Sequence, residues 1–545
     1  MPHANPLRVA AIALPFANTV RALSPTILVA IAVVLVALAA GATVVLARLA
    51  RWRGAGDLNA VQRVAWNSAA PIAAQLLNKV VDLGFALIVL RALGVDGTGE
   101  YDLAVLVWMY TKTFTDFGLG ILATRDVARD HALAGRYLGL TTLLRLGLWV
   151  AALPLVATYT AASWAWLGLS TNTALAIVFL LASIVPDSYG DAANAICNAF
   201  ERMAGPAALT VLKNVIKVAV GLAALAAGWG VVGLAATALV TNLATAGLFV
   251  ILLRRLGVRA AWALPGREAR GFLVEAWPLL LNNLLQNLFF RVDVFVLQPT
   301  RGDHEVGLYT APYRFLNLLG LLPAYFTLAL FPHLARLAAA RGEALAATYA
   351  LAVKLLLIVA LPIVLATMYL APDLMGILGG AAFLPGAAVA LRLLIWFLPF
   401  SYINGITQYV LIAAGRQRLI TRAFALTTGF NLVANLAFTP RYGYPAAAVI
   451  TVLSELVLLA PFLVYTRRYI GPLPTPGTVL RPLLAAVAMG LAAWPVYARL
   501  RDATPAAPWA AVAFGGAVYV VALVGARGIG ATERRLALRL LGRST

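Results

Sequence analysis

Residues 349–371 read YALAVKLLLIVALPIVLATMYLA and contain a single charged side chain, Lys354. A helix needs about 20 consecutive apolar residues to cross roughly 30 Å of hydrocarbon, so this run predicts a membrane-spanning helix. Comparable runs recur along nearly the whole 545-residue chain, which is 62% apolar and 12% charged with a mean hydropathy of +0.89. Soluble domains are about 45–50% apolar and about 25% charged. A membrane barrel would instead show strands of about 10 residues with alternating polarity, and the sequence has no such pattern. We therefore predict an all-α integral membrane protein.

Fifteen runs of this kind define the predicted spans, at residues 26–47, 65–90, 101–122, 137–160, 172–197, 208–227, 231–253, 272–298, 307–332, 349–371, 386–413, 418–438, 445–466, 479–498 and 508–526. The run at 26–47 is assigned as an extra N-terminal helix. A signal peptide is the alternative interpretation of that run, because small residues follow its apolar stretch.

Arginines concentrate in alternate loops, for example at residues 254–270 and 416–422, and the intervening loops carry few. Loops rich in Lys and Arg face the cytoplasm, so this alternation predicts the topology and places the C-terminus in the cytoplasm. The net charge of +21 is therefore a topology signal, and we expect no nucleic-acid partner.

An internal repeat divides the chain. Pro71 corresponds to Pro278, and Gly99-Glu100-Tyr101 corresponds to Gly307-Leu308-Tyr309, at a separation of roughly 207–213 residues. Six spans in each half predict two pseudo-symmetric six-helix bundles, related by an axis along the membrane normal and enclosing a cavity. The predicted organisation is an N-terminal segment (1–64), an N-lobe (65–260), a C-lobe (261–470) and two further C-terminal helices with a basic tail (471–545).

Several chemistries find no support in the sequence. A Walker-type glycine loop ending in Gly-Lys-Ser/Thr is absent, so direct use of ATP is not expected. Cys197 is the single cysteine and the four histidines lack a metal-ligand spacing, so we predict neither a metal nor a cofactor.

Three stretches of the sequence resemble one family of transporters. The first contains Arg91-Ala-Leu-Gly and Asp116-Phe-Gly-Leu-Gly; the second runs from Pro278-Leu-Leu-Leu-Asn-Asn to Phe331-Pro-His-Leu; and the third runs from Gly379-Gly-Ala-Ala-Phe to Pro440-Arg-Tyr-Gly-Tyr-Pro. The chain from about residue 65 to about 470 is thereby similar to the polysaccharide transporters, or O-antigen repeat-unit flippases, of the multidrug/oligosaccharidyl-lipid/polysaccharide (MOP) flippase superfamily.

The resemblance implies a fold like that of multidrug exporters and a function as a flippase. Its cargo would be a polyprenyl-(pyro)phosphate-linked oligosaccharide, moved by alternating access from the cytoplasmic to the outer leaflet of the cell membrane. The implied partners are this lipid-linked oligosaccharide, membrane lipids and glycan assembly proteins. The residues that carry the resemblance are mostly small or structural, so they indicate the architecture better than the cargo.

Polar side chains inside spans usually face a cavity or a partner, because hydrocarbon excludes them. The candidate cavity-lining residues are Lys79, Lys112, Asn283, Asn287, Arg291, Arg314 and Arg392. The lysines and arginines of this set supply cations that could hold the phosphates of a lipid carrier. As alternatives, Lys79–Asp82 and Lys112–Asp116 could neutralise each other within their helices, and the amides could bond between helices.

The acids inside the spans allow two interpretations. Asp82, Asp116, Asp187, Asp293 and Glu455 could couple transport to H⁺ or Na⁺, or could simply pair with intramembrane cations.

Three other functions compete with the flippase of lipid-linked oligosaccharides. A cation-coupled multidrug exporter would favour an acidic cavity, which the lysines inside the spans argue against, whereas a lipid II flippase would carry a chemically similar cargo. A membrane glycosyltransferase or polymerase would need catalytic groups on a sizeable external loop, and the loops here are short. We therefore expect a transporter and not an enzyme.

The charge pattern makes a testable prediction about topology. Single cysteines introduced into the loops at 254–270 and 416–422 should react only with membrane-permeant reagents in intact cells, because these loops face the cytoplasm. A cysteine at 94–100 should react with impermeant reagents. External labelling of the 254–270 loop would overturn the assignment.

Overall fold

A computed structural model describes residues 60–166, 168–340, 344–472, 474–501, 504 and 507–526. Within these ranges all regular secondary structure is helical, which confirms the predicted fold class. The predicted extra helix at 26–47 and the basic tail beyond residue 526 lie outside the described residues.

The contacts divide the described helices into two compact units between Thr310 and Ala311. The N-terminal unit contains α4 (Ala60–Asp116), α5 (Leu119–Arg129), α6 (Ala134–Trp166), α7 (Thr171–Ala199), α8 (Ala204–Ala226), α9 (Gly230–Arg255) and α10 (Gly266–Thr310). A short 3₁₀ helix, His131–Leu133, joins α5 to α6. Helix α10 belongs to this unit because it packs along α4. The homologous lobes predicted at 65–260 and 261–470 stay a prediction.

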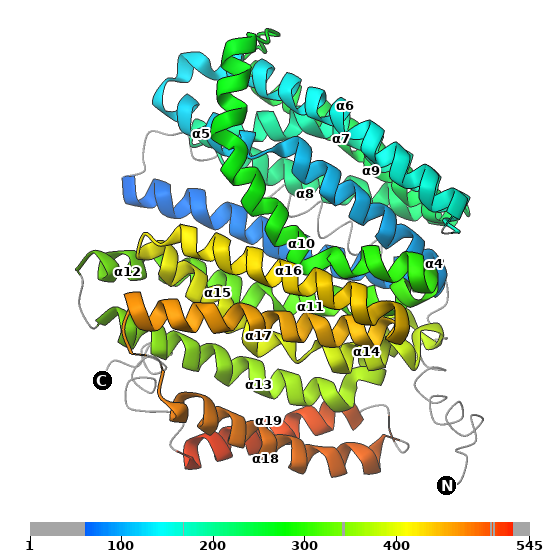
Figure 1. Ribbon diagram of the computed structural model, residues 1–545, viewed down its shortest axis with the longest axis vertical. Coiled ribbons are helices and arrows are strands. Elements are labelled where there is room, and N and C mark those ends of the chain that lie inside the picture. The colour runs from blue at the N-terminus through cyan, green and yellow to red at the C-terminus, as the bar shows by residue number, and fades with distance from the viewer. Residues whose placement is uncertain are drawn as a thin grey trace. The chain divides into compact units, whose positions relative to one another are not determined.

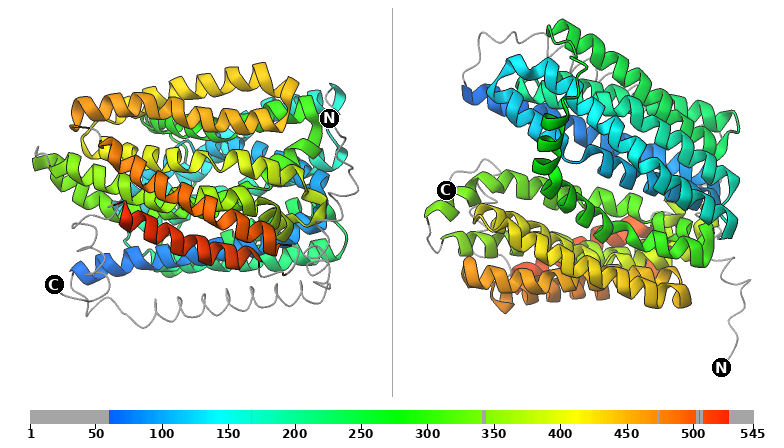
Figure 2. Two further views of the ribbon diagram at one scale, coloured as in Figure 1. Left: turned by 90° about the horizontal axis from the view of Figure 1, so that it is seen from below. Right: turned by 45° about the horizontal axis from the view of Figure 1, so that its top comes forward.

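The second unit contains α11 (Tyr313–Leu319), α12 (Leu321–Ala340), α13 (Ala344–Gly379), α14 (Gly386–Leu394), α15 (Phe397–Ala413), α16 (Gln417–Tyr442), α17 (Tyr444–Tyr469), α18 (Pro476–Leu500) and α19 (Ala507–Gly525). Helices α16 and α17 pack side by side, as Figure 1 shows. The last two helices, α18 and α19, form another neighbouring pair in Figures 1 and 2.

Ten of the described helices are long and apolar enough to cross a membrane, and the bent pair α14–α15 adds one more if it is a single span. Helices α4 and α16, which the sequence also predicts as spans, are not among these ten. Large apolar side chains such as Leu155 and Val521 are 74% and 72% exposed, as expected where lipid is the solvent. The protein is a multi-pass membrane protein.

Exposed tryptophans lie at several helix ends. Trp166 ends α6, while Trp229 and Trp509 lie at the starts of α9 and α19, and all three side chains are exposed. Tryptophan is enriched at the level of the lipid headgroups. The loops that carry these three residues are predicted to face outward, whereas the exposed Trp262 lies in the 254–270 loop that is predicted to be cytoplasmic, so the tryptophans do not distinguish the two sides.

Two glycines break the longest helices at corresponding places. Helix α4 kinks at Gly94, with φ 69°, and α10 kinks at Gly302, with φ 81°. Positive φ angles are strained for residues with a Cβ, which explains glycine at both kinks. The kinks therefore split α4 and α10 at equivalent points of the repeat.

The two kinks pack on each other through a reciprocal contact. A Cβ on Gly99 would overlap the backbone carbonyl of Asp303, and a Cβ on Gly307 would overlap that of Val95. The Nδ1 atom of His304 lies 2.8 Å from Oδ1 of Asp96, and these residues are 208 positions apart, like the members of the repeat. Gly99 on α4 corresponds to Gly307 on α10, and Val95 corresponds to Asp303, so the two contacts are equivalent. The α4–α10 crossing therefore has local pseudo-two-fold symmetry.

This crossing gives a stability prediction. Gly99→Ala and Gly307→Ala should each destabilise the protein by about 1–3 kcal/mol, because the added methyl group forces two backbones apart. Gly147→Ala is the matched control, since space is open beside Gly147 on α6 and alanine favours helix by about 0.5–1 kcal/mol. Thermal unfolding of purified protein, followed by tryptophan fluorescence, measures all three. Wild-type Tm values in both crossing variants would contradict the close approach.

Candidate functional site

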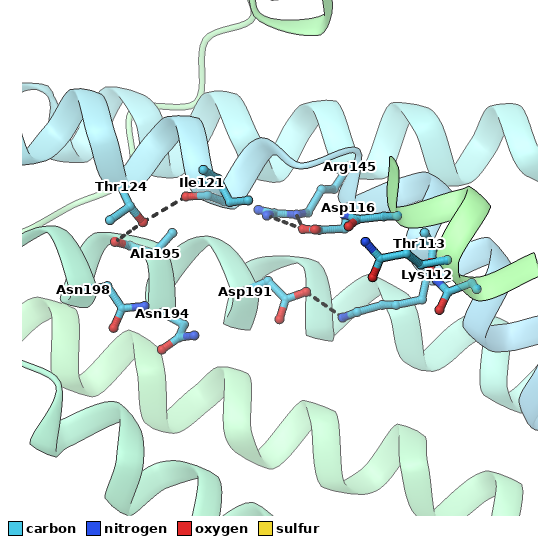
Figure 3. Close-up of a pocket in the computed structure, with 14 residues that line it drawn as sticks. Lys112, Thr113, Asp116, Ile121, Thr124, Arg145, Asp191, Asn194, Ala195 and Asn198 are labelled. Atoms are coloured by element: carbon cyan, nitrogen blue, oxygen red, sulfur yellow. Dashed lines mark hydrogen bonds and ion pairs between the residues drawn. The ribbon is translucent and has the colours of Figure 1, made fainter. Parts of the chain in front are cut away.

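A polar pocket lies inside the N-terminal unit, among α4, α5, α6, α7 and α10 (Figure 3). Its volume is about 620 Å³, within the range of about 300–1,000 Å³ that holds a drug-sized ligand. It is lined by Lys112, Thr113, Asp116, Gly120, Ile121, Thr124, Arg145, Asp191, Asn194, Ala195, Asn198, Asn283, Gln286 and Asn287. Charged, amide and hydroxyl side chains thus dominate a cavity inside a membrane-spanning bundle, where most side chains are apolar.

Lys112 holds the first group of charges together. From α4, its ammonium contacts Asp187 and lies 2.6 Å from Oδ2 of Asp191, both on α7. Asp187 has a second cation, because Nζ of Lys213 on α8 lies 2.9 Å from its Oδ1. Two lysines therefore face two aspartates, and the group has no net charge when all four are ionised. Asp191, with 36% of its side chain exposed, is the aspartate of this group that faces the pocket.

Arg145 and Asp116 form the second charged group. Nη2 of Arg145, on α6, lies 2.8 Å from Oδ1 of Asp116 at the end of α4. The Arg145 side chain is only 2% exposed, and its Nη1 atom has no hydrogen-bond partner among the described residues. This pair is also neutral, so the pocket contains cations without an excess of positive charge.

A break in the chain after Asp116 shapes this part of the pocket. Phe117 and Gly118 adopt left-handed conformations, with φ 51° and 80°, and separate α4 from α5. A Cβ on Gly118 would lie 2.6 Å from Cβ of Leu279, so glycine leaves the notch in which this α10 residue sits. The break therefore seats α10 against the pocket.

Two ion pairs hold the start of α10 beside the pocket. Nη1 of Arg125 lies 2.5 Å from Glu275, and Nη2 of Arg136 lies 2.5 Å from Glu268. Both pairs are solvent-exposed, where an ion pair contributes little stability. They join the first turns of α10 to α5 and α6, and further along the same helix Asn283, Gln286 and Asn287 line the pocket.

The amides of the pocket differ in how they are bonded. Asn287 donates from Nδ2 to Oγ1 of Thr113 at 2.8 Å, and its carbonyl accepts from the Tyr110 hydroxyl at 3.0 Å. The side chains of Asn194, Asn198, Asn283 and Gln286 make no hydrogen bond within the described part of the chain. Those four amides are therefore available to a ligand or to water.

The structure brings together only some of the candidate site residues. Lys112, Asp116, Asn283 and Asn287 line the pocket, and Asp187 binds Lys112 from behind it. Lys79 is an exposed residue of α4 outside this pocket.

The remaining candidates in the N-terminal unit have other surroundings. Asp82 pairs with Lys217 of α8 at 2.5 Å. Asp293 is buried and accepts from the Tyr309 hydroxyl, and Arg291 is half-buried outside the pocket.

Three further candidates lie in the second unit. Nε of Arg392 donates to the Met368 carbonyl at 2.9 Å, and Arg314 is half-buried on α11. Glu455 is 2% exposed and accepts from Nδ2 of Asn404 at 2.7 Å, so its partner is a neutral amide.

The suggested pairing of charges within helices is not what the structure shows. Lys112 and Asp116 take partners from α7 and α6 instead of from each other, and Asp82 takes Lys217 instead of Lys79. Ion pairs between helices link neighbours and satisfy the charges at the same time, whereas a pair within one helix would leave its neighbours unlinked.

Sequence reasoning missed Asn194 and Asn198, whereas Arg145 and Asp191 are charged residues inside predicted spans that the structure brings to the pocket. A signal was present on α7, where Asp187, Asp191, Asn194 and Asn198 follow each other at spacings of four, three and four residues. That spacing puts all four polar groups on one helical face inside a predicted span.

A sequence model of the family described as polysaccharide biosynthesis protein matches residues 64–338, about half of the chain. The chain belongs to this family. The MatE family model matches residues 278–437. Comparison with curated proteins gives no match.

Solved structures show that this family member has the fold of MOP transporters. The lipid II flippase MurJ in an inward closed conformation aligns with a TM-score of 0.68 at 15% identity, over 87% of this chain and 99% of that chain. A multidrug resistance MATE transporter in an inward-facing conformation aligns with a TM-score of 0.58 at 18% identity, over 70% and 94%. A MOP transporter from Pyrococcus furiosus aligns with a TM-score of 0.52 at 18% identity, over 75% and 94%. At these identities the likeness concerns the fold alone.

The Arg145–Asp116 pair leads to a second stability prediction. Arg145→Leu should destabilise the protein by about 1–3 kcal/mol, less than a fully buried pair, because the 37% exposure of Asp116 screens the charge left behind. Arg145→Leu with Asp116→Leu should recover most of the lost Tm, because neither charge remains unpaired. A double variant as unstable as the single one would show that Arg145 acts through packing. Thermal unfolding in lipid nanodiscs measures both variants.

Proposed function

We propose that this protein is a flippase that moves a polyprenyl-(pyro)phosphate-linked oligosaccharide from the cytoplasmic to the outer leaflet by alternating access. The observation that carries the proposal is the polar pocket in the membrane-spanning bundle of a chain that belongs to a polysaccharide biosynthesis family. The printed function of MurJ, a lipid II flippase, supports the same class of cargo.

The chemistry of the pocket suits such a cargo. Sugars and phosphates cannot cross hydrocarbon unaided, because each loses its hydrogen bonds to water. The amides and hydroxyls of the pocket can replace bonds to sugar hydroxyls, and the ammonium of Lys112 can bond a phosphate oxygen once Asp191 moves away. The polyprenyl tail can stay in lipid throughout.

The charge balance of the pocket argues against the export of cationic drugs. A cationic drug would need a carboxylate without a cation, whereas Asp116 and Asp191 each have one and Asp187 has two. The four available amides also give polar contacts that an apolar drug would not use. A lipid II flippase remains the second candidate, because its cargo also joins sugars to a polyprenyl diphosphate.

The setting of this function follows from the arginine-rich loops. We place the protein in the cytoplasmic membrane with its C-terminus in the cytoplasm. Coupling to H⁺ or Na⁺ through one of the candidate acids, and contact with glycan assembly proteins, belong to the same proposal. The transport reaction itself makes and breaks no covalent bond.

Without the protein, the glycan should still be made on its lipid carrier inside the cell but should not reach the cell surface. Cells that lack the gene should lose the surface glycan and accumulate lipid-linked oligosaccharide in the cytoplasmic leaflet. Lys112→Met with Asp191→Asn should give the same result at normal abundance, because this variant removes the ammonium proposed to bind the phosphate and keeps Lys213 paired with Asp187. Surface glycan and extracted lipid-linked sugars measure both effects.

Two further variants give that experiment its controls. Arg255→Ala removes an exposed cation at the end of α9, far along the chain from the pocket residues, and should leave surface glycan normal. Lys79→Ala, on the same helix as Lys112 but outside the pocket, tests whether a wider cavity also needs its charge. Normal surface glycan in the gene deletion would overturn the proposed function.

A further inference from the structure

The polar residues of α7 lie in a fixed order along the pocket. Asp191, bound to Lys112, is followed by Asn194 and then by Asn198, and Figure 3 shows the two amides beside each other and away from Lys112. Seven residues separate Asp191 from Asn198, which corresponds to about 10 Å along a helix. The pocket therefore has a charged end and, beyond it, an end at the amide pair, defined as Asn194 and Asn198.

The hydrogen-bonding capacity at the amide pair is unused. Neither side chain of the amide pair has a hydrogen-bond partner among the described residues; Asn194 is exposed to the pocket, and Asn198 is half-buried in the last turn of α7. An amide offers one acceptor and two donors, and a sugar hydroxyl or acetamido group is also both donor and acceptor. A phosphate offers only acceptors, so it would leave the amide oxygens without a donor.

Neighbouring groups add to this neutral character. Thr124 donates its hydroxyl hydrogen to the carbonyls of Gly120 and Ala195, at 2.9 and 3.1 Å, and so presents only an acceptor to the pocket. Asn283 and Gln286 of α10 line the same pocket with unbonded amides. Beyond Asp191, the amide pair and Thr124 thus form a hydrogen-bonding surface without a formal charge.

We propose that the amide pair is a subsite for the lipid-proximal sugar of the cargo. This inference rests on the proposed function, because in such a cargo the first sugar is joined directly to the phosphate that Lys112 would bind. The pocket of about 620 Å³ takes a ligand of drug size, so it holds the first one or two sugars and leaves the rest of the glycan outside. The amide pair accordingly selects among cargoes by their first sugar.

Binding of two probes tests the subsite. The first probe is the lipid-linked oligosaccharide extracted from cells that lack the gene, and the second is the same polyprenyl diphosphate without sugars. Wild-type protein in nanodiscs should bind the first probe about tenfold more tightly, as expected for one or two net hydrogen bonds. Asn194→Leu with Asn198→Leu should reduce this preference to about twofold or less and leave the affinity for the bare carrier unchanged.

Asn172→Leu is the matched control, because it makes the same substitution in the first turn of α7, outside the pocket. It should keep the tenfold preference, and a Tm measurement on each variant checks folding. The subsite is wrong if the double variant keeps the preference, or if it loses affinity for both probes equally. Equal binding of the two probes by wild-type protein also refutes the subsite, while the flippase function stands. If wild-type protein binds neither probe and the deleted cells accumulate no lipid-linked sugar, the proposed function itself fails.

Discussion

The N-terminal unit is organised by the need to pair the charges that lie between its helices. Lys112 meets this need by binding two aspartates of α7, and Lys213 shares one of them from α8. One turn further along α8, Lys217 binds Asp82 of α4. Because an unpaired charge in hydrocarbon is costly, these contacts fix how α4, α7 and α8 rotate relative to one another. The pocket exists because the charges that line it are already neutralised by neighbours.

This neutrality has a consequence for transport. A cavity with a large excess of positive charge would hold a diphosphate tightly and release it slowly, whereas Lys112 has a resident carboxylate, Asp191, that competes with an incoming phosphate. If a phosphate replaces the Asp191 carboxylate on the Lys112 ammonium, the ammonium always has an anionic partner and no unpaired lysine charge is buried. In the proposed subsite, uncharged amides would add selectivity for the sugar without adding charge.

Helix α10 connects this chemistry to the architecture. Its start is tied to the arginines Arg125 and Arg136, its middle supplies amides to the pocket, and its end crosses α4 at the reciprocal glycine contact. Although α10 is the first helix of the second repeat, its contacts place it in the N-terminal unit. A movement of α10 relative to α5 and α6 would therefore change the pocket wall directly.

The sequence by itself determined the fold class, a helical protein with many apolar spans, and it predicted two repeats. In lipid, a helix satisfies the hydrogen bonds of its own backbone, so long apolar runs predict helices. Glycine is required at Gly99 and Gly307 because a Cβ at either position would overlap the backbone of the other helix. The sequence also identified Lys112, Asn283 and Asn287 as candidate site residues, because polar side chains are rare within apolar spans and usually face a cavity or a partner. Only the tertiary structure decided which acidic and basic side chains form ion pairs. From the sequence, Asp116 could pair with Lys112 on its own helix or with Arg145 on another, and the structure shows the pair with Arg145. The rotation of packed helices makes that choice, and it also turned Asn194 and Asn198 toward the pocket.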